Sequence, residues 1–244
     1  MLTDIHCHLF DLHKKELLRE QLTDANKIGI KNHISVALTN EEVDFHLKNK
    51  QLFTSFYAGI HPKYINQAEI NIDRIVTLCA QKQIVAIGEI GLDKRFEDIE
   101  KQNKILLIQL EIAKEFNLPV VFHNVKMYYE LSKLIRDNFP QTRGILHSFN
   151  GSVDIFSTFK KMDFAFSINC RFQNYIILQQ IISWGRFFIE TDAPYQKPAT
   201  DNSEINSLKN LLIPYNNLIK SSSEDIINRG LQVNNKYYFE KGIS

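Results

Sequence analysis

Short apolar runs rich in β-branched residues recur along the chain and predict eight strands. The runs cover residues 2–6, 30–38, 51–60, 84–91, 118–124, 143–149, 164–170 and 185–192. Between them the pattern changes to helical spacing, most clearly in 97–117, where the helix is expected to end before Pro119. Further helix-like segments cover residues 12–28, 125–138 and 152–162.

Strands that alternate with helices favour parallel βα units, and eight such units match a (β/α)8 TIM barrel of the α/β class. Barrels of about 250 residues commonly form one domain, so we expect a single domain over residues 1–244. Residues 203–242 should form terminal helices on the outside of the barrel. A loop is expected at 196–203, after the last strand, where Pro198 lies among small polar residues.

The composition, 44% hydrophobic with a net charge of +1, suits one large core and no broad basic surface for long nucleic acid. A small local basic patch remains compatible with it. No apolar stretch approaches the roughly 18 residues of a membrane span, and polar residues by position 8 leave no room for a signal peptide. Cys7, Cys79 and Cys170 are widely spaced and odd in number, so a reducing compartment fits them best. We therefore expect a soluble cytoplasmic protein without membrane association.

Potential metal ligands occur where the predicted strands end. They are His6, His8, Glu89, His123, His147 and Asp192. In a (β/α)8 barrel the carboxyl ends of the strands carry the active site, so these side chains are expected to converge. An isolated His-x-His pair is equally compatible with surface or hydrogen-bonded histidines. Strand alternation places His6 and His8 on one side and sends Cys7 toward the helix layer.

The carboxylates have distinct expected roles. Glu89 lies between glycines in Gly88-Glu89-Ile90-Gly91, and its carboxylate can bridge two cations, whereas the alternative is an exposed Glu in a turn. His123 and His147 taken singly are also compatible with core histidines. Asp192 lies nearer the carboxyl end of the last strand than Glu190, so it can reach a metal and accept a proton from water. Glu190 is expected to be a polar residue within the barrel or to orient a ligand from behind.

Several residues after the strands are candidates for substrate contacts. His61, in Gly59-Ile60-His61-Pro62, is ranked as a phosphate or water contact rather than a ligand. The cations of these loops are Lys63, Lys94, Arg95, Lys126, Arg171 and Lys197. The aromatic residues are Phe10, Tyr64, Phe96, Phe149, Phe172 and Tyr195. Cations for phosphates with aromatic faces for bases are typical of single-strand binding, although each residue alone also fits an ordinary solvated loop. No function is assigned to His13, His33 or His46.

Five motifs in order along residues 2–198 resemble the TatD family of metal-dependent deoxyribonucleases. They are Asp4-Ile5-His6-Cys7-His8, Gly59-Ile60-His61-Pro62, Gly88-Glu89-Ile90-Gly91-Leu92-Asp93, His147-Ser148-Phe149-Asn150-Gly151 and Glu190-Thr191-Asp192-Ala193-Pro194-Tyr195. The resemblance implies a barrel of the metallo-dependent hydrolase type, two divalent ions, and 3'-5' exonuclease-like hydrolysis of DNA ends. Related amidohydrolases often use a carboxylated lysine where this chain has Glu89, which favours the TatD family.

Carried over by position, the resemblance implies that one ion binds His6, His8, Glu89 and Asp192, and the other binds Glu89, His123 and His147. Glu89 and Asp192 would be the catalytic carboxylates. Mg, Mn or Zn suits these ligands. His61, Lys94, Arg95 and Lys126 would contact the substrate, and DNA, as single-stranded ends, would be the partner.

Two departures from the family pattern concern the substrate. Asn124-Val125-Lys126-Met127 replaces the usual Ser-Arg-Asp-Ala, so a phosphate contact is lost or moved to Lys126. The Arg-rich segment usual after Tyr195 is also absent. Two alternatives therefore stay open beside the nuclease. One is a metal-dependent ester or amide hydrolase, such as a deacylase of misacylated transfer RNA, and the other is a catalytically quiet barrel within a larger assembly.

Overall fold

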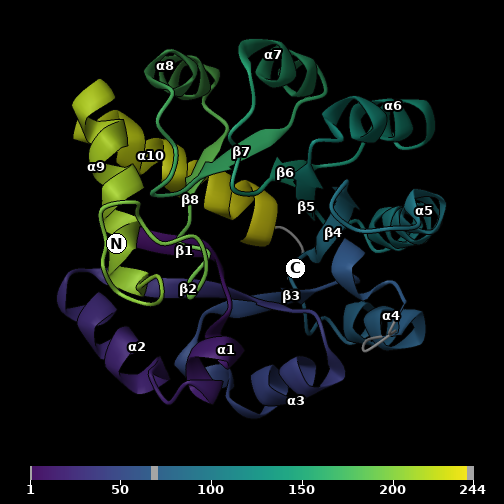
Figure 1. The fold of residues 1–244 in the computed structure, drawn as a ribbon, viewed down its shortest axis with the longest axis horizontal. Coiled ribbons are helices and arrows are strands. Elements are labelled where there is room, and N and C mark those ends of the chain that lie inside the picture. The colour runs from purple at the N-terminus through teal and green to yellow at the C-terminus, as the bar shows by residue number, and fades with distance from the viewer. Residues whose placement is uncertain (1, 67–70, 241–244) are drawn as a thin grey trace.

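The computed structural model describes residues 2–66 and 71–240, and eight parallel strands form its centre (Figure 1). The strands are β1 (Leu2–Cys7), β2 (Ile30–Ala37), β3 (Ser55–Ala58), β4 (Ile87–Asp93), β5 (Val120–Val125), β6 (Gly144–Leu146), β7 (Ala165–Ile168) and β8 (Phe187–Ile189). Each strand pairs with its neighbours in sequence order. All eight predicted strands are confirmed, although most are shorter than their apolar runs.

Hydrogen bonds between the first and last strand regions close the sheet into a barrel. The amide of Asp192 donates to the carbonyl of His6 at 2.9 Å, and the amide of His8 donates to Ala193 at 2.7 Å. The (β/α)8 fold class expected from the alternating pattern is therefore correct.

Helices surround the barrel (Figure 1). They are α1 (Leu9–Lys14), α2 (Leu18–Lys27), α3 (Asn40–Lys48), α4 (Ile72–Ala80), α5 (Ile99–Glu115), α6 (Tyr128–Asn138), α7 (Val153–Lys161), α8 (Tyr175–Trp184), α9 (Leu212–Ser221) and α10 (Glu224–Asn235). The segments predicted at 97–117, 125–138 and 152–162 correspond to α5, α6 and α7. The sequence analysis assigned no bounds to α3, α4 or α8. None of the described helices is long and apolar enough to cross a membrane.

The single helix predicted over 12–28 is wrong, because two helices occupy this region. Glu16 adopts a left-handed conformation with φ of 62°, which a continuous α-helix cannot contain. The chain turns there, so α1 ends at Lys14 and α2 begins at Leu18. The buried residues Leu12 and Leu18 are six positions apart, a spacing that does not keep both on one face of a continuous helix.

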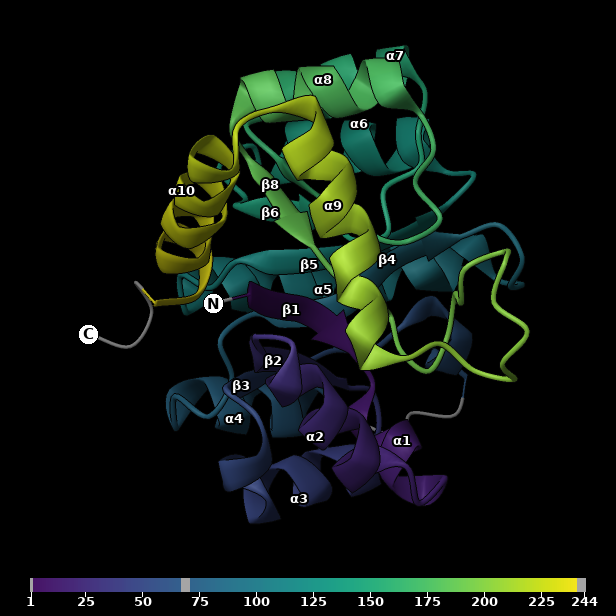
Figure 2. The ribbon, with the colours of Figure 1, turned by 90° about the vertical axis from the view of Figure 1, so that its left-hand side faces the viewer.

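The end of the chain contributes both to the outside of the barrel and to its interior. Helices α9 and α10 pack outside, as predicted for residues 203–242, of which 241 and 242 lie outside the described residues (Figure 2). The following π-helical turn η4 (Lys236–Glu240) differs from the prediction, because Tyr238 and Phe239 join the cluster of side chains that fills the barrel. The Tyr238 and Phe188 rings lie 5.4 Å apart. The turn closes the amino-terminal end of the barrel and leaves the carboxyl ends of the strands as its open mouth.

Candidate metal centre

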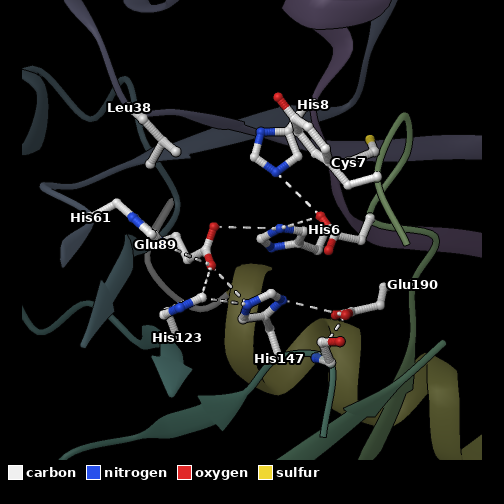
Figure 3. Close-up of polar contacts among 12 residues, drawn as sticks. His6, Cys7, His8, Leu38, His61, Glu89, His123, His147 and Glu190 are labelled. Atoms are coloured by element: carbon white, nitrogen blue, oxygen red, sulfur yellow. Dashed lines mark hydrogen bonds and ion pairs between the residues drawn. The ribbon is translucent and has the colours of Figure 1, made fainter. Parts of the chain in front are cut away.

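Glu89, buried on β4, lies at the centre of the converging ligands (Figure 3). Its Oε1 lies 2.6 Å from His123 Nδ1 and 2.7 Å from His147 Nε2. Its Oε2 faces the opposite group, 3.7 Å from His6 Nε2. The two oxygens of one carboxylate therefore face different imidazoles, as a bridging ligand does, and His147 also stacks on His6 with ring centroids 4.2 Å apart and forms a group with His6 and Asp192.

The first set combines the His-x-His pair of β1 with Asp192 from the loop after β8. Asp192 Oδ1 lies 3.3 Å from both His6 Nε2 and His8 Nε2. His6 Nδ1 contacts the Tyr57 hydroxyl, whereas its buried Nε2 makes no hydrogen bond. A buried nitrogen aimed between two carboxylates without a hydrogen bond fits a cation ligand. Cys7 points away from this group and packs between barrel and helices, as expected (Figure 3).

The second set is oriented by carboxylates behind the rings. His123 Nε2 lies 2.8 Å from Asp93 Oδ2, and His147 Nδ1 lies 3.4 Å from Glu190 Oε1. Glu190 also accepts a hydrogen bond from the Ser148 amide at 2.7 Å. Such partners fix the orientation of a ligating imidazole and increase its basicity. Glu190 therefore lies where the sequence analysis expected it, while the contact of Asp93 with His123 was missed.

Carboxylates and imidazoles shift each other's protonation throughout the cluster. Burial raises the pKa of Glu89, but the charges of His147 and His123 outweigh burial and hold that pKa well below its usual range. Burial likewise raises the pKa of Asp192, and His6 and His8 reverse the shift. Burial lowers the pKa of His8, yet Asp192 raises it to about 9. Glu89 and Asp192 are therefore ionised, and their negative charges favour a cation between them.

His61 also lies close to the Glu89 carboxylate, but unlike His8 its imidazole has a lowered pKa. Its Nε2 lies 3.6 Å from Glu89 Oε1, and the two residues form a group with His123 compact enough to hold a cation. Burial lowers the pKa of His61 to about 3, and its Nδ1 accepts a hydrogen bond from the Lys63 amide at 3.0 Å. The ring is therefore neutral with its proton on Nε2. That nitrogen is a hydrogen-bond donor, which suits the predicted phosphate or water contact.

The family model described as TatD related DNase matches residues 3–239. The chain belongs to the TatD family. It is 31% identical over 222 residues to an uncharacterized metal-dependent hydrolase of Buchnera aphidicola from Acyrthosiphon pisum, covering 81% of this chain and 83% of that protein. The Escherichia coli protein named 3'-5' ssDNA/RNA exonuclease TatD is 30% identical over 151 residues, 58% of each chain.

Solved structures agree with the fold. The TatD homolog YjjV of Escherichia coli superposes with a TM-score of 0.81 at 24% identity, covering 98% of both chains. A TatD family hydrolase of Entamoeba histolytica gives a TM-score of 0.81 at 20% identity, covering 98% of this chain and 97% of that one. The protein is thus a TatD family metal-dependent hydrolase, with clusters of His, Asp and Glu able to bind metal.

An open cavity of about 560 Å³ leads from the mouth of this TatD barrel to the cluster. Of the predicted cations, Lys63, Arg95 and Arg171 line it, whereas Lys94, Lys126 and Lys197 do not. The phosphate contact that the sequence analysis moved to Lys126 is therefore not supported. The exposed Lys126 side chain lies outside the lining, whose cations are Lys63, Arg95 and Arg171.

The predicted aromatic contacts are only half correct. Tyr64, Phe96 and Tyr195 line the cavity. Phe10, Phe149 and Phe172 are buried instead, with exposed fractions of 7%, 1% and 6%, because they pack in the core between barrel and helices. A position after a strand does not decide whether an aromatic side chain turns toward solvent or toward the core.

Two polar contacts near the cluster were not anticipated. The Arg95 guanidinium donates to both oxygens of Asp93, and Nη2 lies 2.6 Å from Oδ2. Gln196 donates to Asp192 Oδ2 and accepts from the Ser148 hydroxyl at 2.9 Å. The position of Gln196, four residues after Asp192 in a loop, was the available signal for this contact. Oδ1 of Asp192 therefore faces His6 and His8, while its Oδ2 accepts a hydrogen bond from the Gln196 side-chain amide.

Asp4, Cys7 and His33 form a further group of ligand-type side chains behind β1, away from the mouth. The Asp4 carboxylate already accepts from the Thr191 amide at 3.0 Å and the Thr191 hydroxyl at 2.6 Å. It thereby ties β1 to the loop carrying Asp192. His46 is also structural, because its nitrogens lie 2.6 Å from the Glu42 carbonyl and 2.7 Å from the Ser35 hydroxyl.

Proposed function

We propose that the protein is a two-metal phosphodiesterase that degrades DNA from single-stranded ends, as a 3'-5' exonuclease. The observation that carries this proposal is the division of ligands around Glu89, whose two oxygens face different imidazoles at 2.6 and 3.7 Å. Further support comes from the family model and from relatives named as exonucleases of single-stranded DNA and RNA.

Two divalent ions fit the residues present. His6, His8, Asp192 and Glu89 would hold one, and Glu89, His123 and His147 the other, with Mg²⁺, Mn²⁺ or Zn²⁺ compatible with imidazole and carboxylate ligands. Ions about 3.5–4 Å apart would acidify water and stabilise charge on the attacking and leaving oxygens of phosphoryl transfer. The ionised carboxylates and the free nitrogen of His6 are what such ions require.

The chain's own groups supply the remaining steps. Asp192 is ionised and is positioned to accept the proton of the attacking water. Its Oδ2 is held by Gln196, so the carboxylate has a fixed orientation. His61 presents a neutral N–H at the cavity, where it would donate to a phosphate oxygen. Arg95 and Arg171, on the cavity lining, would bind phosphate by charge.

The shape of the cavity favours a strand end. The cluster of ligand-type side chains lies within the barrel, and the cavity reaches it from the end where the strands terminate. Tyr64, Phe96 and Tyr195 line the approach together with the arginines, and this combination of aromatic faces and cations suits unpaired nucleotides. The proposed partner is therefore single-stranded DNA.

Matched assays test the proposal. Metal-stripped protein reconstituted with Mn²⁺ or Mg²⁺ should release nucleotides stepwise from linear single-stranded DNA and leave circular single strands intact. Equal cutting of circles would replace the exonuclease with an endonuclease. Turnover of ester or amide substrates, including misacylated transfer RNA, without cleavage of either DNA would favour the deacylase alternative. No turnover of any substrate would support the quiet barrel.

A further inference from the structure

The cavity that leads to the ligand cluster is here called the catalytic cavity. A second hollow lies beside it on the same face of the barrel. It is lined by residues from the loop after β6, from the connection between β7 and α8, and from the first turn of α8, namely Asn150, Arg171, Gln173, Asn174, Tyr175 and Ile176. Arg171 lines both hollows, so the two are continuous across this one side chain. A ligand extending out of the catalytic cavity past Arg171 enters the second hollow.

Arg171 is held in place at this boundary. Its Nε donates to the Lys197 carbonyl at 3.0 Å, and its backbone amide donates to Asn169 Oδ1 at 2.9 Å. The two terminal nitrogens of the guanidinium make no hydrogen bond to any residue that the structure describes. A guanidinium anchored through Nε with its outer donors free is arranged to bind a phosphate.

Tyr175 presents an aromatic surface in the second hollow. It is the first residue of α8, its side chain is 62% exposed, and its hydroxyl accepts a hydrogen bond from Gln179 Nε2 at 3.0 Å. Among the described aromatic residues, three are exposed, namely Tyr129, Tyr175 and Tyr195. All three follow strands at the mouth, and Tyr195 lines the catalytic cavity itself. Of these exposed rings, Tyr175 lines the second hollow, Tyr195 lines the neighbouring cavity, and Tyr129 lines neither.

We propose that Arg171 and Tyr175 form a subsite for the part of a single-stranded nucleic acid that lies outside the catalytic cavity. Arg171 binds the phosphate next to the cavity, and a base of the following nucleotide stacks on Tyr175, while the amides of Asn150 and Gln173 are available to base or sugar. The subsite rests on the proposed function, because its occupant is the rest of the strand being cleaved.

A single strand fits this hollow better than a duplex or a protein segment. The hollow offers one cation, one aromatic ring and several amides, but no cluster of cations to cover the two backbones of a duplex. Because Arg171 lines both hollows, a ligand that occupies the second hollow and the catalytic cavity together must be long enough to pass this side chain. The enzyme is therefore expected to prefer oligonucleotides over dinucleotides.

Binding measurements on the metal-free full-length chain test the subsite separately from catalysis. Fluorescence anisotropy of labelled oligothymidylate should show a roughly tenfold weaker affinity for Tyr175→Ala, because base stacking on one aromatic ring contributes about that much. Tyr175→Phe keeps the ring and should bind as the wild type does. Tyr129→Ala removes another exposed ring of the mouth, outside the hollow, and is the matched control. Arg171→Ala should reduce the slope of log affinity against log salt by about 0.7.

Catalytic assays distinguish failure of the subsite from failure of the proposed function. Hydrolysis of bis(p-nitrophenyl) phosphate should be unchanged in Tyr175→Ala, because this small diester occupies the catalytic cavity alone, whereas cleavage of long oligothymidylate should fall. Equal binding by Tyr175→Ala and wild type, or an equal loss in Tyr129→Ala, would overturn the subsite. A wild type that binds oligothymidylate in this manner but hydrolyses neither substrate would overturn the proposed function and leave the subsite in place.

Discussion

Asp192 and Glu190 follow β8 two residues apart, and their surroundings give them different roles. Asp192 faces the unbonded nitrogen of His6 and also His8, each at 3.3 Å. Glu190 is fully buried behind His147 and accepts the Ser148 amide. Asp192 therefore lines the cavity, and Glu190 contacts His147 from inside the barrel.

Asp192→Asn should lower turnover by about 10²- to 10⁴-fold, because an amide cannot accept the proton of the attacking water. Metal content and substrate affinity should change less, since the amide oxygen can still face the cation. Steady-state kinetics on oligonucleotides and elemental analysis would measure both effects. Glu190→Gln, which removes a buried charge of equal size from the same segment, should be milder. Near-normal turnover in Asp192→Asn would remove this residue from the role of general base.

His33 makes stability depend on pH. Burial lowers its pKa to about 4, whereas an unfolded histidine titrates near about 6.5. Between these values the unfolded chain binds a proton that the folded chain excludes. The free energy of unfolding should therefore fall as the pH decreases from 6.5 through 4, by up to about 3 kcal/mol from this residue.

Urea unfolding as a function of pH would measure that contribution. His33→Leu should flatten the acid dependence, whereas His13→Leu, at an exposed histidine, should leave it unchanged. An equally steep dependence in His33→Leu and wild type would assign the acid sensitivity to other groups, such as His46, whose pKa burial also lowers to about 4.

At the level of single residues, the sequence predicted those positions that depend only on where the strands end. His6, His8, Glu89, His123, His147 and Asp192 converge because parallel strands of a barrel end at one rim. Contacts that depend on side-chain rotamers in loops could not be predicted. Phe149 turns into the core, Lys126 lies away from the cavity, and Gln196 reaches back to Asp192.

At the level of elements, alternating patterns identified all the strands but not every helix boundary. Helices α1 and α2 each carry buried apolar residues, and the single left-handed residue Glu16 lies between them. The turn η4 was assigned to the outside with the other terminal helices. Its Tyr238 instead enters the barrel, because the amino-terminal end needs a large apolar side chain beneath Phe188. Apolar residues on a terminal helix do not indicate which surface they cover.

Tyr238→Ala should reduce the free energy of unfolding by about 3–5 kcal/mol, the usual cost of removing a large aromatic ring from a core. Denaturant unfolding would measure this loss. Tyr238→Phe keeps the ring and Val233→Ala changes an exposed position on α10, so both should stay close to the wild type. Metal content should be unaffected, because η4 lies at the opposite end of the barrel. A loss below 1 kcal/mol would show that the turn does not support the barrel.

At the level of the whole molecule, a nearly neutral protein brings three cations to the cavity, whose lining also contains Asp11 and Glu42. The net charge is +1, yet Lys63, Arg95 and Arg171 all line the cavity above an acidic and imidazole cluster. We therefore expect phosphate to bind at the mouth rather than along the rest of the surface. Glu89 contacts His6 through one carboxylate oxygen and His123 and His147 through the other, so it connects the two groups of proposed metal ligands.

Calorimetric titration of the metal-free protein with Mn²⁺ tests this central role of Glu89 most directly. The wild type should bind about two equivalents, and His6→Ala and His123→Ala should each lose one, because their ligand sets are separate apart from Glu89. Glu89→Gln should weaken both sites together. A wild type that binds no Mn²⁺ at saturating concentration, or a Glu89→Gln variant that still binds two equivalents with unchanged affinity, would contradict the account.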